Sequence, residues 1–192
     1  MTSRDAILAA LRQNQPEAAP LPNIEAFPMP SVDLLAHFKG MIVEIGGRVA
    51  EVAAGEVAAA IAMHYPEART IASATPAVEG TVGLPSDTDP HALADLDVFV
   101  CEGSLGVAES GAVWVSEAQM IHRAAPFLTQ HLVLLLDRQK LVWNLHEAYA
   151  HLPAIPEGFG VFIAGPSKTA DIEQSLVIGA HGPRSLTVLL VG

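Results

Sequence analysis

The chain of 192 residues has a single cysteine, Cys101. One cysteine cannot form an internal disulfide or supply the four thiolates of an ordinary iron–sulfur cluster. Because it ends an apolar segment typical of a buried strand, we expect a packed, unreactive thiol. The dinucleotide pattern Gly-x-Gly-x-x-Gly is also missing, since the glycines of residues 103–111 have the wrong spacing. We therefore expect no cofactor, whether flavin, nicotinamide or iron–sulfur cluster.

Lysine and arginine are scarce as well. There are 10 of them against 21 acidic residues, which gives a formal net charge of −11. Contacts to phosphates need clustered basic side chains, so this balance argues against nucleic-acid partners and against a wide anionic-membrane surface. The longest apolar runs, such as residues 132–136 and 186–191, are far too short to span a bilayer. We expect a cytoplasmic protein without a membrane partner.

What the chain has in abundance is apolar surface. Hydrophobic residues make up 51% of it and charged residues only 16%. A domain of this size buries about 70% of its unfolded surface. The composition predicts a substantial core, or a core together with a subunit interface, so a homo-oligomer is possible.

The order of segments predicts one α/β domain behind an N-terminal arm. Residues 1–30 comprise a short helix and a stretch with five prolines, which we expect to be extended. In residues 31–192, apolar strands alternate with helical segments, a pattern typical of a mainly parallel sheet with helices on both faces. The predicted strands are residues 49–52, 69–72, 97–101, 113–115, 132–136, 161–164 and 186–191.

The most distinctive segment is Gly165-Pro166-Ser167-Lys168-Thr169-Ala170-Asp171-Ile172-Glu173. It follows a predicted strand and precedes a predicted helix at residues 170–176, a position where α/β folds bind ligands. Its candidate binding residues are Ser167, Lys168, Thr169, Asp171 and Glu173. A purely structural interpretation is also available, in which a hydroxyl caps the helix and the two acids complement its dipole. Lys168 conflicts with that helix dipole, and a ligand carboxylate or phosphate beside it would remove the conflict.

Two further loops carry candidate residues. Glu109 lies in a glycine-flanked bend between two predicted strands, and glycines allow a backbone to approach a ligand closely. It is our candidate catalytic residue, with a solvated turn as the alternative. His181 lies in a tight turn after the predicted helix and is a candidate binding residue or acid–base group. The alternative is that it only forms a hydrogen bond with a backbone carbonyl. We expect the turns at 106–111 and 165–169 to meet at the carboxyl edge of the sheet.

Metal sites find little support in the histidine spacing. The zinc-peptidase helix motif places two histidines at positions i and i+4, whereas His151 follows His146 at i+5. At about 100° per residue, this spacing turns the two side chains roughly 140° apart. We predict no metal site.

Taken together, residues 106–111, 165–173 and 179–183 resemble the lactate-utilisation protein C family, the LUD domain. The passages from Phe38 to Val49 and from Arg123 to His131 resemble it too. The resemblance implies a fold related to CoA transferases and ribose-5-phosphate isomerase. It also implies a role in oxidising L-lactate to pyruvate beside two iron–sulfur partner proteins, which would hold the clusters that a single cysteine cannot.

Two functional hypotheses follow from the resemblance and the residues. In the first, the chain is a non-redox subunit that binds a small carboxylate such as lactate, or docks the cluster proteins, through Glu109, Lys168 and His181. In the second, it is an enzyme in its own right that uses Glu109 as base or nucleophile on a small acyl or phosphorylated substrate. The resemblance favours the first hypothesis.

Overall fold

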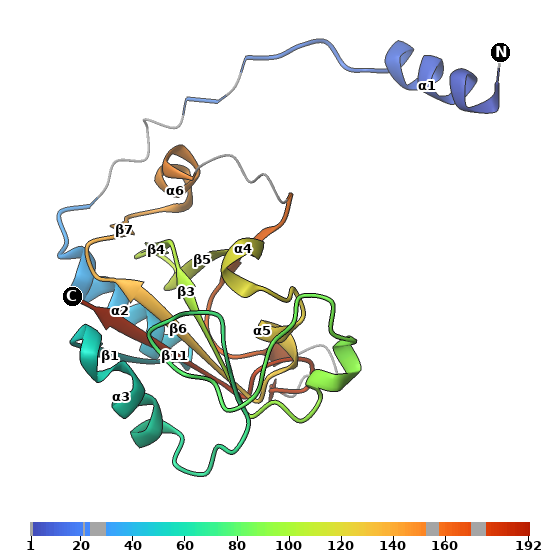
Figure 1. Cartoon of the computed structure of the whole chain (residues 1–192). Coiled ribbons are helices and arrows are strands. Elements are labelled where there is room, and N and C mark those ends of the chain that lie inside the picture. The colour runs from blue at the N-terminus through green and yellow to red at the C-terminus, as the bar shows by residue number, and fades with distance from the viewer. Residues whose placement is uncertain (1, 21, 24–29, 153–157, 170–175) are drawn as a thin grey trace.

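The computed structural model describes residues 2–20, 22–23, 30–152, 158–169 and 176–192. Its centre is a sheet with the strand order β1-β11-β6-β3-β2, in which all neighbouring strands are parallel (Figure 1). The strands are β1 (Arg48–Val52), β2 (Ile71–Ser73), β3 (Val98–Gly103), β6 (His131–Asp137) and β11 (Ser185–Val191). The prediction of an α/β fold with a mainly parallel sheet is confirmed.

A second sheet accompanies the first and has the order β7-β4-β5-β8. Its β4 pairs parallel with β7, while β5 pairs antiparallel with both β4 and β8. A separate two-stranded antiparallel hairpin joins β9 to β10. These strands are β4 (Leu105–Val107), β5 (Ala112–Ser116), β7 (Leu141–Val142), β8 (Gly160–Ile163), β9 (Lys168–Thr169) and β10 (Val177–Ile178).

Helices lie on both faces of the parallel sheet. The side chains of a strand alternate between the two faces, and here each face has a core of its own. Val98 and Val100 of β3 pack in one core with helix α3, whereas Phe99 and Cys101 pack in the other with helix α2 and the second sheet. The helices are α1 (Ser3–Gln13), α2 (Leu34–Glu44), α3 (Val57–His64), α4 (Glu117–Met120), α5 (Ala125–Leu128) and α6 (Leu145–His151), with short 3-10 turns η2 (Ala54–Glu56) and η3 (Pro90–Leu93).

Helix α2 positions the segments that matter below. Asp33 caps its start by accepting a hydrogen bond from the Ala36 amide at 3.1 Å. Phe38 and Ile42 are fully buried on the sheet, which stabilises the fold by about 1.5–3 kcal/mol for each side chain. The helix gives way to Gly46, whose φ of 83° lies in the left-handed region that glycine tolerates best.

Helix α1 is capped by Thr2 in a reciprocal pair of hydrogen bonds with Asp5. None of its residues is buried, and Figure 1 shows the helix apart from the sheets. Ile7 and Leu11, which the sequence places on one face of this helix, are 59% and 60% exposed. The helix therefore gains little stability from packing in this chain.

Candidate functional site

Two of the sequence-predicted loops meet at the end of helix α2. Gly111 closes the loop of Glu109, and a Cβ atom added to it would lie 3.2 Å from Ile45 Cδ1. Gly165 opens the loop of Lys168, and a Cβ atom there would lie 2.9 Å from the Ile45 carbonyl oxygen. Such contacts leave no room for a side chain, and Gly165 also has a φ of 72°. The two glycines therefore let both loops contact the same residue, Ile45.

The surroundings of Lys168 explain its charge without a ligand. Lys168 does not begin a helix, because it lies in strand β9 and pairs with Ile178 of β10. Its Cε and Nζ atoms lie 3.8 Å from the position that a Cβ atom of Gly46 would take, just beyond the C-terminus of α2. The C-terminal end of a helix carries partial negative charge and favours a cation. The conflict predicted from the sequence is therefore absent.

Ser167, Thr169 and His181 belong to the same hairpin region as Lys168. The Ser167 amide donates to the Pro183 carbonyl at 2.9 Å, and Gly182 approaches the Ser167 side chain closely. Thr169 pairs with Val177 in the β9–β10 ladder. His181 is exposed in the turn between β10 and β11. This hairpin thus brings the predicted hydroxyl, ammonium and imidazole groups into one region of the surface.

Asp171 and Glu173 lie outside the described residues, as does most of the predicted helix at 170–176. Leu176, the only residue of that helix that the structure describes, is not helical. Glu109 is described and exposed. Its amide donates to the Trp143 carbonyl at 2.8 Å, which fixes the backbone of the loop. The Oγ of the neighbouring Ser110 is buried and has no hydrogen-bond partner within the described part of the chain.

The meeting point of the loops differs from the expected carboxyl edge. Ile45 and Gly46 precede Arg48, the first residue of β1, and Pro183 precedes Ser185, the first residue of β11. Both contacts therefore lie at the amino end of the parallel sheet. The expectation was wrong because the strand before Gly165, β8, belongs to the second sheet. The rule that ligands bind at carboxyl ends applies to strands of the parallel sheet only.

The carboxyl end of the parallel sheet contains a cavity of about 470 Å³ that the sequence analysis missed. Glu102 of β3 and Asp137 of β6 line it together with Lys140. The buried Thr75 donates to Glu102 Oε1 at 2.6 Å and holds this carboxylate in place. The other residues that line the cavity are Ala54, Val57, Ala77, Gly103, Leu135, Leu136, Gln139, Val191 and Gly192.

A signal for this cavity was present in the sequence. Glu102 directly follows the apolar segment of β3, and Asp137 directly follows that of β6. The two strands are parallel neighbours in the sheet. These strands needed only to be assigned to one sheet for the two carboxylates to share an edge. Two carboxylates beside a single ammonium favour ligands with hydrogen-bond donors over anions.

Cys101 is completely buried in the core, where burial raises the pKa of its thiol far above the ordinary value. The packed thiol predicted from the sequence is confirmed, since a thiol that stays protonated is a poor nucleophile. Among the described residues, no group of three or more histidine, cysteine, aspartate or glutamate side chains is placed to hold a metal ion. The described helices are all too short or too polar to cross a membrane.

A comparison with known protein families shows to which family this chain belongs. Residues 25–191 match the LUD domain. The chain belongs to the LUD-domain family. The match begins within the predicted arm and covers all of the strands of both sheets, so the resemblance inferred from the glycine-rich motifs is confirmed.

Relatives of this LUD-domain chain carry a common name. "Lactate utilization protein C" of Deinococcus radiodurans is 28% identical over 193 residues, which cover 95% of this chain and 91% of the relative. The protein of the same name from Bacillus pumilus is 35% identical over 91 residues, which cover 44% of this chain and 38% of that relative. The protein of the same name from Shouchella clausii is 32% identical over 101 residues, which cover 50% of this chain and 44% of that relative.

A solved structure shares the fold. The crystal structure of a DUF162 family protein from Deinococcus radiodurans superposes with a TM-score of 0.66 and covers 86% of this chain and 100% of that one. The two are 20% identical in sequence, so the likeness concerns the arrangement of the elements and not the activity.

Proposed function

We propose that this chain acts in lactate utilisation as a non-redox component that docks iron–sulfur partner proteins. The docking surface consists of Glu109, Lys168 and His181. The observations that carry this assignment are the contact of both loops with Ile45 and the approach of Gly182 to Ser167, which gather residues from three separate segments at one end of the sheet.

The exposure of these groups favours docking over the enclosure of a small ligand at this surface. Glu109, Lys168 and His181 are all exposed, and none of them lines either the carboxyl-end cavity or the amino-end cavity described below. Exposed groups of mixed charge, held on backbones that hydrogen bonds and glycine contacts fix, suit the rim of a protein interface. Complementary charges at such a rim steer a partner and set its orientation.

Support for the lactate system comes from the family and from the name shared by the three relatives above. The single buried cysteine supports a non-redox role, because any cluster would have to be bound by the partner. The partner is thus expected to be an iron–sulfur protein that is produced together with this chain during growth on lactate.

Co-purification tests the docking surface. The tagged chain is isolated from cells grown on L-lactate, and bound iron and acid-labile sulfide are measured. We expect the wild type to retain iron–sulfur proteins and the Glu109→Gln, Lys168→Met double variant to lose them, while Lys140→Met at the opposite end of the sheet retains them. Equal recovery of iron with the wild type and the double variant would rule out this surface.

The alternative, an enzyme that uses Glu109, makes a different prediction. The purified chain alone would then convert an acyl-CoA or a sugar phosphate, and Glu109→Gln would abolish the turnover. Under the docking proposal the isolated chain turns over neither compound, and Glu109→Gln changes only partner binding. The two outcomes separate a catalytic carboxylate from an interface carboxylate at the same position.

A further inference from the structure

A second cavity, of about 300 Å³, opens at the amino end of the parallel sheet on the side of helix α3. It is much larger than the roughly 10–15 Å³ that a single water molecule requires. Its polar walls come from elements that are far apart in the sequence. They are Arg48 at the start of β1, His64 and Tyr65 at the end of α3, Glu67, Asp97 before β3, and His131 at the start of β6.

His131 is fixed on one side of its ring by a hydroxyl network. Its Nδ1 lies 2.8 Å from Ser185 Oγ, and its ring stacks on Tyr65 at 4.7 Å between centroids. The Tyr65 hydroxyl in turn lies 3.1 Å from Ser185 Oγ and 2.7 Å from Thr187 Oγ1. This network fixes the orientation of the ring and leaves Nε2 of His131 without a hydrogen-bond partner among the described residues.

A second imidazole nitrogen in the same cavity has no partner. Nε2 of His64 is buried and forms no hydrogen bond with any residue that the structure describes. A buried polar atom without a partner costs about 1–3 kcal/mol, so native proteins rarely leave one unused. The His64 ring lines the cavity beside His131, whose Nε2 is free to bind a ligand.

The positive charges around His131 offset the negative ones. Arg48, Glu67 and Asp97 line the cavity, and Arg184 also acts on His131. Arg48 and Arg184 form no ion pair within the described part of the chain, and both are close enough to act on His131. Burial first, and then the charges of Arg184 and Arg48, lower the pKa of His131, while Asp97 acts in the opposite direction. Asp97 is already engaged, because its Oδ2 accepts the amides of Arg69 and Thr70.

We propose that this cavity binds a small oxyanion, a carboxylate or a phosphate, between the Arg48 guanidinium and the free Nε2 of His131, beside the His64 ring. A guanidinium matches the planar or tetrahedral oxygens of such an ion, and hydrogen bonds between charged groups are the strongest that a site can offer. Arg184 adds positive charge that acts on His131. The site is distinct from the docking surface, since it shares no residue with Glu109, Lys168 and His181.

Binding is linked to the protonation of His131. An anion beside Arg48 favours the imidazolium form, so it raises the pKa of His131 and binds more tightly as the pH falls through that pKa. A rise of one pKa unit corresponds to about tenfold tighter binding to the protonated form. The titratable and charged groups that face His131 are Arg48, His64, Tyr65, Glu67, Asp97 and Arg184.

Histidine-ring NMR of the full chain tests the site, with inorganic phosphate, L-lactate and propionate as separate probes. We expect at least one probe to raise the pKa of His131 saturably and to shift the His64 signal. Stronger binding of phosphate identifies a phosphate ligand, whereas stronger binding of L-lactate than of propionate identifies a carboxylate with an oxygen at C2.

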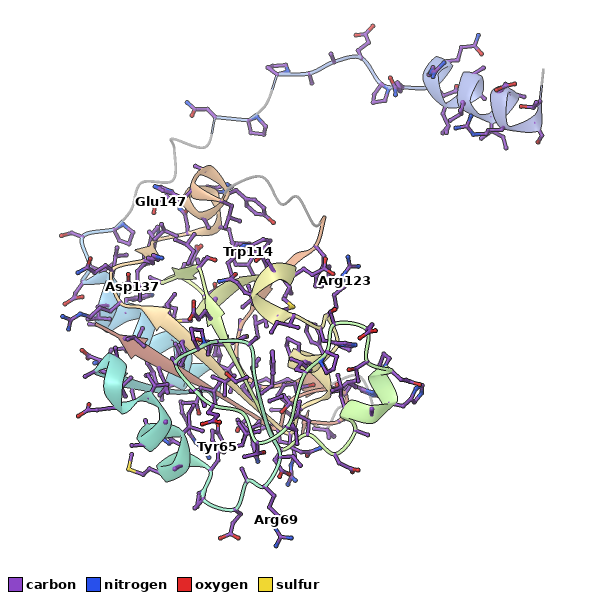
Figure 2. All side chains as sticks on the ribbon, in the orientation of Figure 1. Tyr65, Arg69, Trp114, Arg123, Asp137 and Glu147 are labelled. Carbon is purple, nitrogen blue, oxygen red and sulfur yellow. The ribbon has the colours of Figure 1, made fainter. Side chains whose placement is uncertain are left out.

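Two arginine variants provide the comparison. Arg48→Met should weaken binding about tenfold or more, because it removes the charged partner of the anion. Arg69→Met is the matched control and should bind as the wild type does, since the Arg69 side chain points away from the body of the protein (Figure 2). The proposal is wrong if no probe in large excess moves the His131 and His64 signals, or if the two variants bind equally well.

Discussion

The two ends of the parallel sheet differ in charge and in how their polar groups are held. At the carboxyl end, Glu102, Asp137 and Lys140 line the larger cavity, and all three side chains are exposed. At the amino end, the rings of His131 and Tyr65 are stacked and joined to the hydroxyls of Ser185 and the buried Thr187. Figure 2 labels Asp137 at the first end and Tyr65 at the second.

This difference shows the limit of a general rule. Parallel α/β sheets usually bind ligands beyond the carboxyl ends of their strands. Here the carboxyl end contributes two carboxylates against one ammonium, whereas at the amino end Arg48 and Arg184 offset Glu67 and Asp97. Charge therefore assigns a small anion to the amino end. The loops of Glu109 and Lys168 reach that end as well, by way of the second sheet.

The largest difference between the two ends should be in their contribution to anion binding. Arg48→Met is expected to lose about tenfold or more in affinity for the best oxyanion probe, because a charged hydrogen-bond partner is removed. Lys140→Met, at the carboxyl end, is expected to bind as tightly as the wild type. Isothermal titration calorimetry measures both. The reverse pattern, with Lys140→Met impaired and Arg48→Met normal, would assign the anion to the carboxyl-end cavity.

The second largest difference should be in how much each end contributes to the free energy of unfolding. Tyr65→Phe removes a buried hydroxyl and leaves Thr187 and Ser185 short of a partner. It should lower the free energy of unfolding by about 1–3 kcal/mol. Lys140→Met should change it by less than about 0.5 kcal/mol, because the side chain is exposed. Urea denaturation followed by circular dichroism measures both. A Tyr65→Phe protein as stable as the wild type would show that the network contributes nothing.

A smaller effect tests the position of Lys168. If its ammonium stabilises the C-terminus of α2, Lys168→Met should cost about 0.3–1 kcal/mol in the free energy of unfolding at low ionic strength. The cost should shrink as salt is added, since the interaction is screened. Lys39→Met is unsuited as a control because Lys39 pairs with Glu51, so Lys140→Met serves here too. A stabilising effect of Lys168→Met would indicate that the ammonium faces a positive environment.

The pH dependence of stability should show the weakest effect. The pKa of His131 is lowered in the folded state, so below its ordinary value of 6.5 the unfolded chain binds more protons than the native one. Stability should therefore fall as the pH drops below about 6.5, and above that range His131 should contribute no pH dependence. His131→Gln should reduce this slope. Thermal unfolding between pH 7 and 5 measures it, and identical slopes would contradict the burial of a neutral imidazole.

The sequence predicted the fold well because the decisive signals are local. The apolar runs at residues 132–136 and 186–191 lie within β6 and β11. The assignment of β8 to a second sheet could not be predicted, since strand pairing depends on contacts distant in sequence. The β9–β10 hairpin was missed because its strands are only two residues long.

The candidate sites were predicted less completely. The glycine-rich loops indicated Glu109, Lys168 and His181 because glycine spacing is visible in a sequence. Arg48, His64 and His131 were not selected, since each is an isolated residue at the end of a different element and shares no motif with the others. Only the register of β11 with β6, which places Ser185 opposite His131, brings the hydroxyl network together.

Growth on L-lactate tests the central claim most directly. In the organism that encodes this chain, the gene is deleted and complemented with the wild type, with the Glu109→Gln, Lys168→Met double variant, or with Lys140→Met. The account predicts that the deletion abolishes growth on L-lactate but not on pyruvate, and that the wild type and Lys140→Met restore it while the double variant does not. Normal growth of the deletion strain on L-lactate would contradict it.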